Sequence, residues 1–318
     1  MNSTVLIVEN LGKSYGDVLA VDGVSFRAER GSVFGLLGPN GAGKSTTINC
    51  ISGLLPPSSG RASINGADIV NAAKAAKQSL GVVPQDLALY DDLSAIDNLR
   101  FWGQAYGLRG SELDERVKTV LTYIGLGDRA RDLPKTFSGG MKRRLNFGCA
   151  VVHRPAVLLL DEPTVGVDPQ SRSRLFELVE SERANGACIV YTTHYMEEAE
   201  RLCDSVAIID NGQLIAQGTV AALREQLDAR DVLQLSGNFD TEKCTRAIND
   251  LQAGALDKLQ IVSHDEGSLV LSLPDASQHL SSIFQVLDNS GATIAETSLR
   301  RPNLETLFML LTGKELRE

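Results

Sequence analysis

Sulfur-containing residues and tryptophan are scarce in this sequence. Its 318 residues include 1 tryptophan, 4 methionines and 5 cysteines. The cysteines are odd in number and widely spaced, with no CxxC pair and no cysteine–histidine cluster: Cys50, Cys149, Cys188, Cys203 and Cys244. This spacing excludes a disulfide framework and a structural zinc site, so we expect reduced thiols of the kind found in the cytosol.

Long hydrophobic runs and an excess of basic charge are also missing. No apolar run is longer than that at residues 156–160, which is far shorter than the roughly 18 residues that a membrane-spanning helix needs. Lysine and arginine total 31 against 40 acidic residues, and the net charge of −9 disfavours broad electrostatic binding of nucleic acid or anionic lipid. With 43% hydrophobic and 22% charged residues, the composition is that of a folded globular protein.

The first two thirds of the chain alternate between strand and helix patterns. Strands are predicted at residues 4–11, 18–26, 32–38, 80–84, 157–160 and 187–191. Helices are predicted at residues 43–53, 170–184 and 195–203, and residues 94–153 form a largely helical insert. Within that insert, Ser94 with Asp97 and Ser111 with Asp114 each match a capping box. The alternation predicts an α/β fold with a parallel sheet, which a hairpin turning at Asn211-Gly212 completes.

A second, smaller domain follows. Its predicted order is strand 232–235, helix 241–252, strands 259–262 and 268–273, helix 277–289, strand 293–299 and a final helix from Leu304. This βαββαβ order predicts a small α+β sandwich.

A phosphate-binding loop lies between the strand at 32–38 and the helix that follows it. Nine consecutive residues contain the pattern GxxxxGK(S/T): Gly38, Pro39, Asn40, Gly41, Ala42, Gly43, Lys44, Ser45 and Thr46. The glycines let successive backbone N–H groups face the phosphates at the positive end of the helix. In this pattern Lys44 neutralises β/γ-phosphate charge and Ser45 is a ligand of Mg²⁺.

Two carboxylates follow the buried strand at 157–160. Asp161 ends that strand, where the edge of a parallel sheet meets the phosphate loop, so it can hold Mg²⁺ directly or through water. Glu162 comes one residue later and can polarise an attacking water. A P-loop alone is compatible with a kinase, a GTPase or an ATPase, and this pair of carboxylates favours an ATPase.

The segment Phe137-Ser138-Gly139-Gly140-Met141 lies between the two phosphate motifs. Ser138 can cap a helix whose open N–H end suits an anion. In this order the chain resembles the nucleotide-binding subunit of an ATP-binding cassette (ABC) transporter, whose signature is usually written LSGGQ. The resemblance implies that Ser138, Gly139 and Gly140 bind the γ-phosphate held by an opposite subunit, so that two subunits enclose two ATP molecules.

The same resemblance assigns four further residues. Tyr15 would stack on adenine, and Gln85 would contact Mg²⁺ and the attacking water. Asp168 would lie at the subunit junction, and His194 would contact the γ-phosphate. Together with Glu162 and Lys44, Gln85 and His194 are the expected catalytic residues, and Ser45, Gln85 and Asp161 are the expected metal ligands.

The resemblance further implies an organisation and a function. It implies a P-loop NTPase cassette at residues 1–225, with a β-rich subdomain, a RecA-like core and a helical subdomain at about 92–155, and an accessory α+β domain at 226–318. Residues 138–145, 162–172 and 304–317 are similar to exporters of the daunorubicin- and linearmycin-resistance kind. The implied function is that of an ATPase which binds Mg²⁺ and ATP, forms a homodimer, and drives a separate permease from the cytoplasmic face of the membrane.

Two alternatives remain open at this stage. One is an ATPase of the same cassette family that acts on nucleic acid or ribosomes, although the negative charge and the single cassette do not lead us to expect nucleic-acid binding. The other is a metabolic P-loop kinase, which would leave Ser138-Gly139-Gly140 unexplained.

Overall fold

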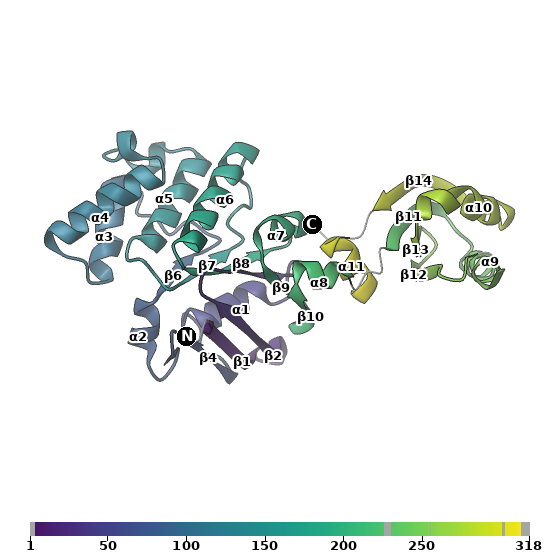
Figure 1. Ribbon diagram of the computed structural model, residues 1–318, viewed down its shortest axis with the longest axis horizontal. Helices are drawn as coiled ribbons and strands as arrows, with labels where there is room; N and C mark the ends of the chain where they lie inside the picture. The colour runs from purple at the N-terminus through teal and green to yellow at the C-terminus, as the bar shows by residue number, and fades with distance from the viewer. Residues whose placement is uncertain (1–3, 226–229, 255, 301–302, 313–318) are drawn as a thin grey trace. The chain divides into compact units, whose positions relative to one another are not determined.

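The computed structural model describes residues 4–225, 230–254, 256–300 and 303–312 (Figure 1). The chain divides into two compact units, Met1–Gln217 and Gly218–Glu318. This boundary lies before the short helix α8 (Val220–Glu225), whereas the sequence pattern suggested a boundary after it.

The first unit contains an antiparallel sheet of four strands in the order β2-β1-β4-β5. The strands are β1 (Thr4–Tyr15), β2 (Val18–Glu29), β4 (Ser59–Ile64) and β5 (Ala67–Asp68). The strands β4 and β5 were not predicted, because their short sequences contain few apolar residues and are separated by the Asn65-Gly66 turn. The two strands predicted at residues 4–11 and 18–26 are present as β1 and β2, and both are longer than expected.

The second sheet of this unit has six strands in the order β10-β9-β3-β8-β7-β6. The strands are β3 (Val33–Leu37), β6 (Leu80–Val83), β7 (Val157–Asp161), β8 (Cys188–Thr193), β9 (Ser205–Asp210) and β10 (Gln213–Thr219). The pairs from β9 through β3, β8 and β7 to β6 are all parallel. Between β9 and β10, Asn211 and Gly212 have φ of 48° and 79°, as the predicted type I′ turn requires. The predicted parallel α/β core is confirmed.

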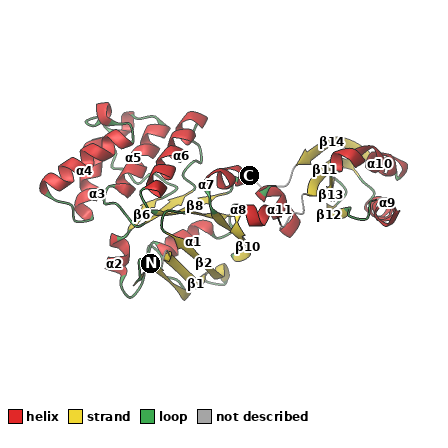
Figure 2. Cartoon of the chain, viewed as in Figure 1, coloured by secondary structure: helices red, strands yellow, loops and turns green. Residues whose placement is uncertain are grey.

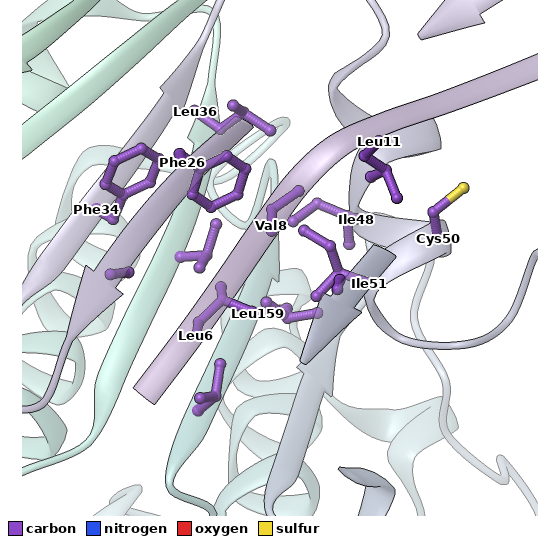
Figure 3. Close-up of a cluster of buried hydrophobic side chains, with 14 of the residues drawn as sticks. Leu6, Val8, Leu11, Phe26, Phe34, Leu36, Ile48, Cys50, Ile51 and Leu159 are labelled. Carbon is purple, nitrogen blue, oxygen red and sulfur yellow. The ribbon is translucent and has the colours of Figure 1, made fainter. Parts of the chain in front are cut away.

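A continuous hydrophobic core joins the two sheets through α1 (Lys44–Ile51), as the close-up in Figure 3 shows. Phe26 of β2 stacks on Phe34 of β3, with ring centroids 4.6 Å apart. Ile48 of α1 and Leu159 of β7 belong to the same buried cluster. The helix that follows the P-loop is therefore held between two sheets, which fixes where its N-terminus points.

The remaining helices of the first unit lie along the sheet and in the helical insert (Figure 2). They are α2 (Ala73–Gln78), α3 (Ala95–Ala105), α4 (Gly110–Tyr123), α5 (Gly139–Val151), α6 (Pro169–Ala184) and α7 (Met196–Leu202), with short 3₁₀ turns at Gly127–Arg129 and Pro134–Thr136. Ser94 caps α3 as predicted, because its Oγ accepts a hydrogen bond from the Asp97 N–H. The capping box predicted at Ser111 is wrong, since α4 already begins at Gly110 with Arg109 as N-cap.

The second unit has the predicted βαββαβ order. Its elements after α8 are β11 (Arg230–Asn238), α9 (Thr241–Gly254), β12 (Gln260–His264), β13 (Ser268–Pro274), α10 (Ala276–Asn289), β14 (Thr293–Arg300) and α11 (Leu304–Thr312). The sheet is antiparallel in the order β12-β13-β11-β14, and residues of α9 and α10 share one core with it. Residues 313–317 of the closing segment lie outside the described residues.

The structure also bears on the expectations about the cysteines and about membrane-spanning helices. All five cysteines are free and buried. Among the helices that the structure describes, none combines the length and the apolar character needed to cross a membrane.

Candidate active site

The P-loop and both predicted carboxylates meet at the carboxyl edge of the parallel sheet. The loop follows β3, Asp161 ends β7, and His194 follows β8, and these three strands are neighbours in the order β3-β8-β7. Because parallel strands present their carboxyl ends at one edge, side chains as distant in sequence as Lys44, Asp161 and His194 lie together there.

Lys44 closes the P-loop from the first turn of α1. Its Nζ donates hydrogen bonds to the carbonyl oxygens of Gly38 at 2.8 Å and Pro39 at 3.0 Å. Gly43 precedes the helix with φ of 102°, and a Cβ there would lie 2.5 Å from the carbonyl oxygen of Ala20. Only glycine fits this conformation and this close approach, so the loop curls tightly and leaves backbone N–H groups on its concave side.

A cavity of about 230 Å³ opens at the loop. It is lined by Asn40, Gly41 and residues 43–46 of the loop, and by Gln85 and Glu162 from elsewhere in the chain. Gln85 follows β6, and its carbonyl oxygen accepts a hydrogen bond from the guanidinium of Arg143. The structure thus brings the phosphate loop, the amide of Gln85 and one predicted catalytic carboxylate around one space.

Asp161 is a buried carboxylate with two hydroxyl partners. Its Oδ1 accepts hydrogen bonds from Thr192 Oγ1 at 2.7 Å and Ser45 Oγ at 3.1 Å. Burial raises the pKa of Asp161, and the nearby Glu162 charge adds to the rise, while the two hydrogen bonds and Lys44 oppose it. A hard cation beside Asp161 and Ser45 would offset that unfavourable burial of charge, and oxygen atoms are the ligands that Mg²⁺ takes.

Glu162 contacts both Lys44 and His194. Its Oε1 lies 3.0 Å from Lys44 Nζ, and its Oε2 lies 3.4 Å from His194 Nδ1. Its backbone has φ of 43°, a conformation that non-glycine residues rarely adopt, and its N–H donates to Thr192 Oγ1 at 2.8 Å. Such strain persists where surrounding contacts hold it, and it is common at active sites.

Several predicted residues do not line this cavity: Gly38, Pro39, Ala42, Asp161 and His194, which lie at the same sheet edge or in the P-loop, and Tyr15, Ser138, Gly139, Gly140 and Asp168. Tyr15, at the end of β1, is 48% exposed, and Lys13 Nζ lies 5.4 Å from its ring centroid. Ser138 caps α5, where Gly139 and Gly140 form the first turn, and Asp168 caps α6. Hydrogen bonds from Ser171 lower the pKa of Asp168. Ser138 and Gly139 are exposed, Gly140 is buried, and none of these three residues lines the pocket of its own chain.

Thr192 is a site residue that the sequence analysis did not identify. Its hydroxyl lies between the two carboxylate residues, because it donates to Asp161 Oδ1 and accepts from the Glu162 N–H. The only sequence feature that pointed to Thr192 was its place in the run Tyr191-Thr192-Thr193, at the end of a strand. Only the register of β7 with β8, which pairs Asp161 with Thr192, shows what that threonine contacts.

The sequence matches the ABC transporter family over residues 21–165. It is 44% identical to the linearmycin resistance ATP-binding protein of Bacillus subtilis, across 99% of this chain and 100% of that protein. It is 35% identical to a daunorubicin resistance ATP-binding protein of Streptomyces coeruleorubidus, across 100% of this chain and 98% of that protein. Both matches extend over nearly the whole of this chain and therefore include the second unit.

The solved structure of an ATP-binding subunit of an ABC transporter superposes with a TM-score of 0.66. It is 36% identical and covers 70% of this chain and 93% of its own length. The fold and the sequence comparisons therefore agree on the first unit.

Proposed function

The chain belongs to the family of ABC transporter ATP-binding subunits, and from this premise we propose that it energises an exporter of drug-like or antibiotic-like amphipathic compounds. Members of the family are ATPases coupled to transport, and this chain is an ATP-binding ATPase subunit of that kind. The observation that carries the detailed proposal is the convergence of Lys44, Ser45, Asp161, Glu162 and His194 at one sheet edge.

We assign the residues of this edge to separate tasks. The P-loop amides and Lys44 bind the phosphates, and Glu162 accepts a proton from the attacking water while His194 orients the γ-phosphate. Ser45 and Asp161, with Gln85, would hold Mg²⁺, which supplies charge neutralisation when bound. Among the described residues, no group of three or more histidine, cysteine, aspartate or glutamate side chains is arranged so that it could hold a metal ion by itself. This is compatible with Mg²⁺, which takes few protein ligands and completes its shell with phosphate and water.

A second copy of the chain would complete each site. Ser138 and Gly139 are exposed and lie outside the pocket of their own chain, at the N-terminus of a helix of 13 residues. The open N–H groups of such a helix suit an anion. We propose that this end contacts the γ-phosphate bound by the opposite copy, with Asp168 at the junction and Tyr15 against the adenine.

The permease would dock at a groove beside the helical insert. A cavity of about 470 Å³ is lined by apolar residues that include Leu54, Val82 and Pro84. Trp102 and Asn146 also line this cavity. In the described part of the chain, Trp102 Nε1 and Asn146 Nδ2 are both buried without a hydrogen-bond partner. A permease segment that offers backbone carbonyl oxygens would satisfy both donors, and it would hold this chain at the cytoplasmic face of the membrane.

The proposed class of exported compound rests on the relatives. Their names describe resistance to linearmycin and daunorubicin. The transported molecule itself would contact the permease rather than this chain, so these names support a class of compound and not one compound.

The test uses the Glu162→Gln variant in the native host. The variant should bind ATP and hydrolyse it about 10²-fold more slowly or worse, because removing a general base has costs of this order. With Mg²⁺ and ATP added, gentle solubilisation of the membranes and affinity purification should recover a hydrophobic permease with the tagged chain. Glu197→Gln, an exposed neutralisation on α7, is the matched control for the charge change.

Two outcomes would contradict the proposal. Near-normal turnover of Glu162→Gln would remove the assigned catalytic role. Recovery of ribosomes or nucleic acid in place of a permease would leave the ATPase intact and refute the transport function.

A further inference from the structure

A buried carboxylate outside the phosphate pocket gathers three hydroxyl groups. Glu198 of α7 is only 4% exposed. Its Oε2 accepts hydrogen bonds from Thr164 Oγ1 at 2.9 Å, Tyr191 OH at 2.9 Å and Thr193 Oγ1 at 3.0 Å. All three bonds are buried, so they are strong and exclude water.

These partners belong to the two segments that carry the catalytic side chains. Thr164 lies two residues after Glu162, and Thr193 immediately precedes His194. The backbone N–H of Tyr195 also donates to Thr193 Oγ1, at 2.9 Å. Glu198 Oε2 therefore connects the segment that carries Glu162 to the segment that carries His194. These two residues also contact each other directly, through Glu162 Oε2 and His194 Nδ1.

The other oxygen of Glu198 faces a third segment. Its Oε1 lies 3.6 Å from Arg172 Nε on α6, and both atoms are buried with no hydrogen-bond partner in the described residues. The guanidinium of Arg172 also lies 5.5 Å from the ring centroid of Tyr195. Because Asp168 is the N-cap of α6, this ion pair connects the helix at the proposed subunit junction to Glu198, which also contacts the segment that contains His194.

A role in packing alone does not account for this arrangement. A buried charge carries a desolvation penalty that an apolar residue of similar size would avoid. What the carboxylate adds is a set of fixed side-chain contacts between the 162–164 segment, the 193–195 segment and Arg172 of α6. Misplacement of a reacting group by about 1 Å can cost about 10²-fold in rate, so such a connection matters where catalytic side chains depend on it.

We propose that Glu198 is a positioning residue for ATP hydrolysis, which holds the 162–164 and 193–195 segments so that Glu162 and His194 keep their relative placement. The inference rests on the catalytic roles proposed above for those two residues. Glu198 itself is buried behind them and does not line the phosphate cavity.

The decisive experiment measures steady-state ATP hydrolysis by Glu198→Gln and Glu197→Gln in the full chain, with ATP affinity and melting temperature measured in parallel. For Glu198→Gln we expect kcat to fall about 10- to 100-fold, by analogy with the loss found when a side chain that orients a metal ligand through a hydrogen bond is removed. The KM for ATP should change less than threefold, because the P-loop contacts remain. Glu197→Gln should match the unmodified chain, since its side chain is exposed on the same helix.

A second series keeps the test informative if Glu198→Gln does not fold. Thr164→Val preserves volume and removes one hydroxyl donor, whereas Thr164→Ser keeps the donor. We expect kcat to fall in Thr164→Val and to be largely restored in Thr164→Ser, a difference that loss of packing would not produce.

The inference is overturned if kcat of Glu198→Gln stays within twofold of Glu197→Gln, or if KM rises in proportion to the loss of kcat. Equal kcat values for Thr164→Val and Thr164→Ser would also overturn it. Glu162→Gln separates this result from the proposed function, because a fully active Glu162→Gln would refute the catalytic assignment whatever the Glu198 variants do.

Discussion

His153 illustrates how burial sets the chemistry of a single residue. Its ring is parallel to that of Tyr106, with centroids 3.5 Å apart, and its Nε2 lies 3.0 Å from the carbonyl oxygen of Leu80. Its Nδ1 is buried without a partner in the described part of the chain. Burial, with a smaller contribution from the nearby Arg116 charge, lowers the pKa of His153 to about 4.

This lowered pKa predicts a pH dependence of stability. In the unfolded chain the imidazole gains its proton near pH 6.5, whereas in the folded chain it gains it only near the pKa of about 4. As the pH falls through this window the unfolded state binds more protons than the folded state, so the free energy of unfolding decreases. The full loss should reach about 3 kcal/mol below the folded pKa, and urea unfolding at a series of pH values measures it.

The His153→Gln variant isolates this contribution from other titrating groups. Glutamine keeps a hydrogen-bond donor for the Leu80 carbonyl oxygen but has no proton to gain in this range. As the pH falls from 6.5 to 4, the free energy of unfolding of the unmodified chain should decrease relative to that of the variant. A difference that stays constant across this range would show that the imidazole is equally protonated in both states.

Among individual residues, one part of the candidate site could be predicted from the sequence, and another part could not, for a physical reason. The P-loop and the Asp161-Glu162 pair could be placed together because parallel strands share a carboxyl edge. Thr192 and Glu198 could not, since their roles depend on the register of β8 with β7 and on how α7 packs against β8. A hydroxyl or carboxylate in isolation carries no signal for such cross-element hydrogen bonds.

At the scale of elements, two identical sequence patterns have different outcomes. Ser94-x-x-Asp97 forms a cap, and Ser111-x-x-Asp114 does not, because Gly110 adopts φ of 54° and α4 begins with it. The capping pattern indicates that a favourable hydrogen bond is available at a helix start. It does not indicate at which residue the helix begins. The strong periodic elements were therefore predictable, and individual helix starts were not.

The difference between the two serines gives a matched pair of variants. Ser94→Ala removes the acceptor for the Asp97 N–H at the start of α3 and should reduce the free energy of unfolding by about 1 kcal/mol. Ser111→Ala should change it by less than about 0.5 kcal/mol, because Ser111 lies inside α4 and caps nothing. Trp102 is the only tryptophan and belongs to α3, so its fluorescence during urea unfolding reports on this helix directly. Equal losses for both variants would contradict the assignment of the caps.

At the scale of the whole molecule, the residues proposed to bind one ATP are distributed over two surfaces of the chain. The phosphate cavity is lined by the P-loop, Gln85 and Glu162, while Ser138 and Gly139 are exposed elsewhere on the same unit. Under the proposed function, a chain with this division binds nucleotide alone and encloses the γ-phosphate with a second copy. Nucleotide binding and dimer formation should therefore be separable by mutation.

The Glu162→Gln variant with Mg²⁺ and ATP should accordingly run as a dimer in size-exclusion chromatography with light scattering. Adding Ser138→Glu should return it to a monomer, because a carboxylate placed at this helix end would repel the γ-phosphate of the opposite copy. Its ATP affinity should stay unchanged, since Ser138 does not line the cavity of its own chain. Thr122→Glu on α4 introduces the same charge at another exposed position and should leave the dimer intact. A dimer that persists in Ser138→Glu would mean that the two copies do not meet through this signature, even if both bind ATP.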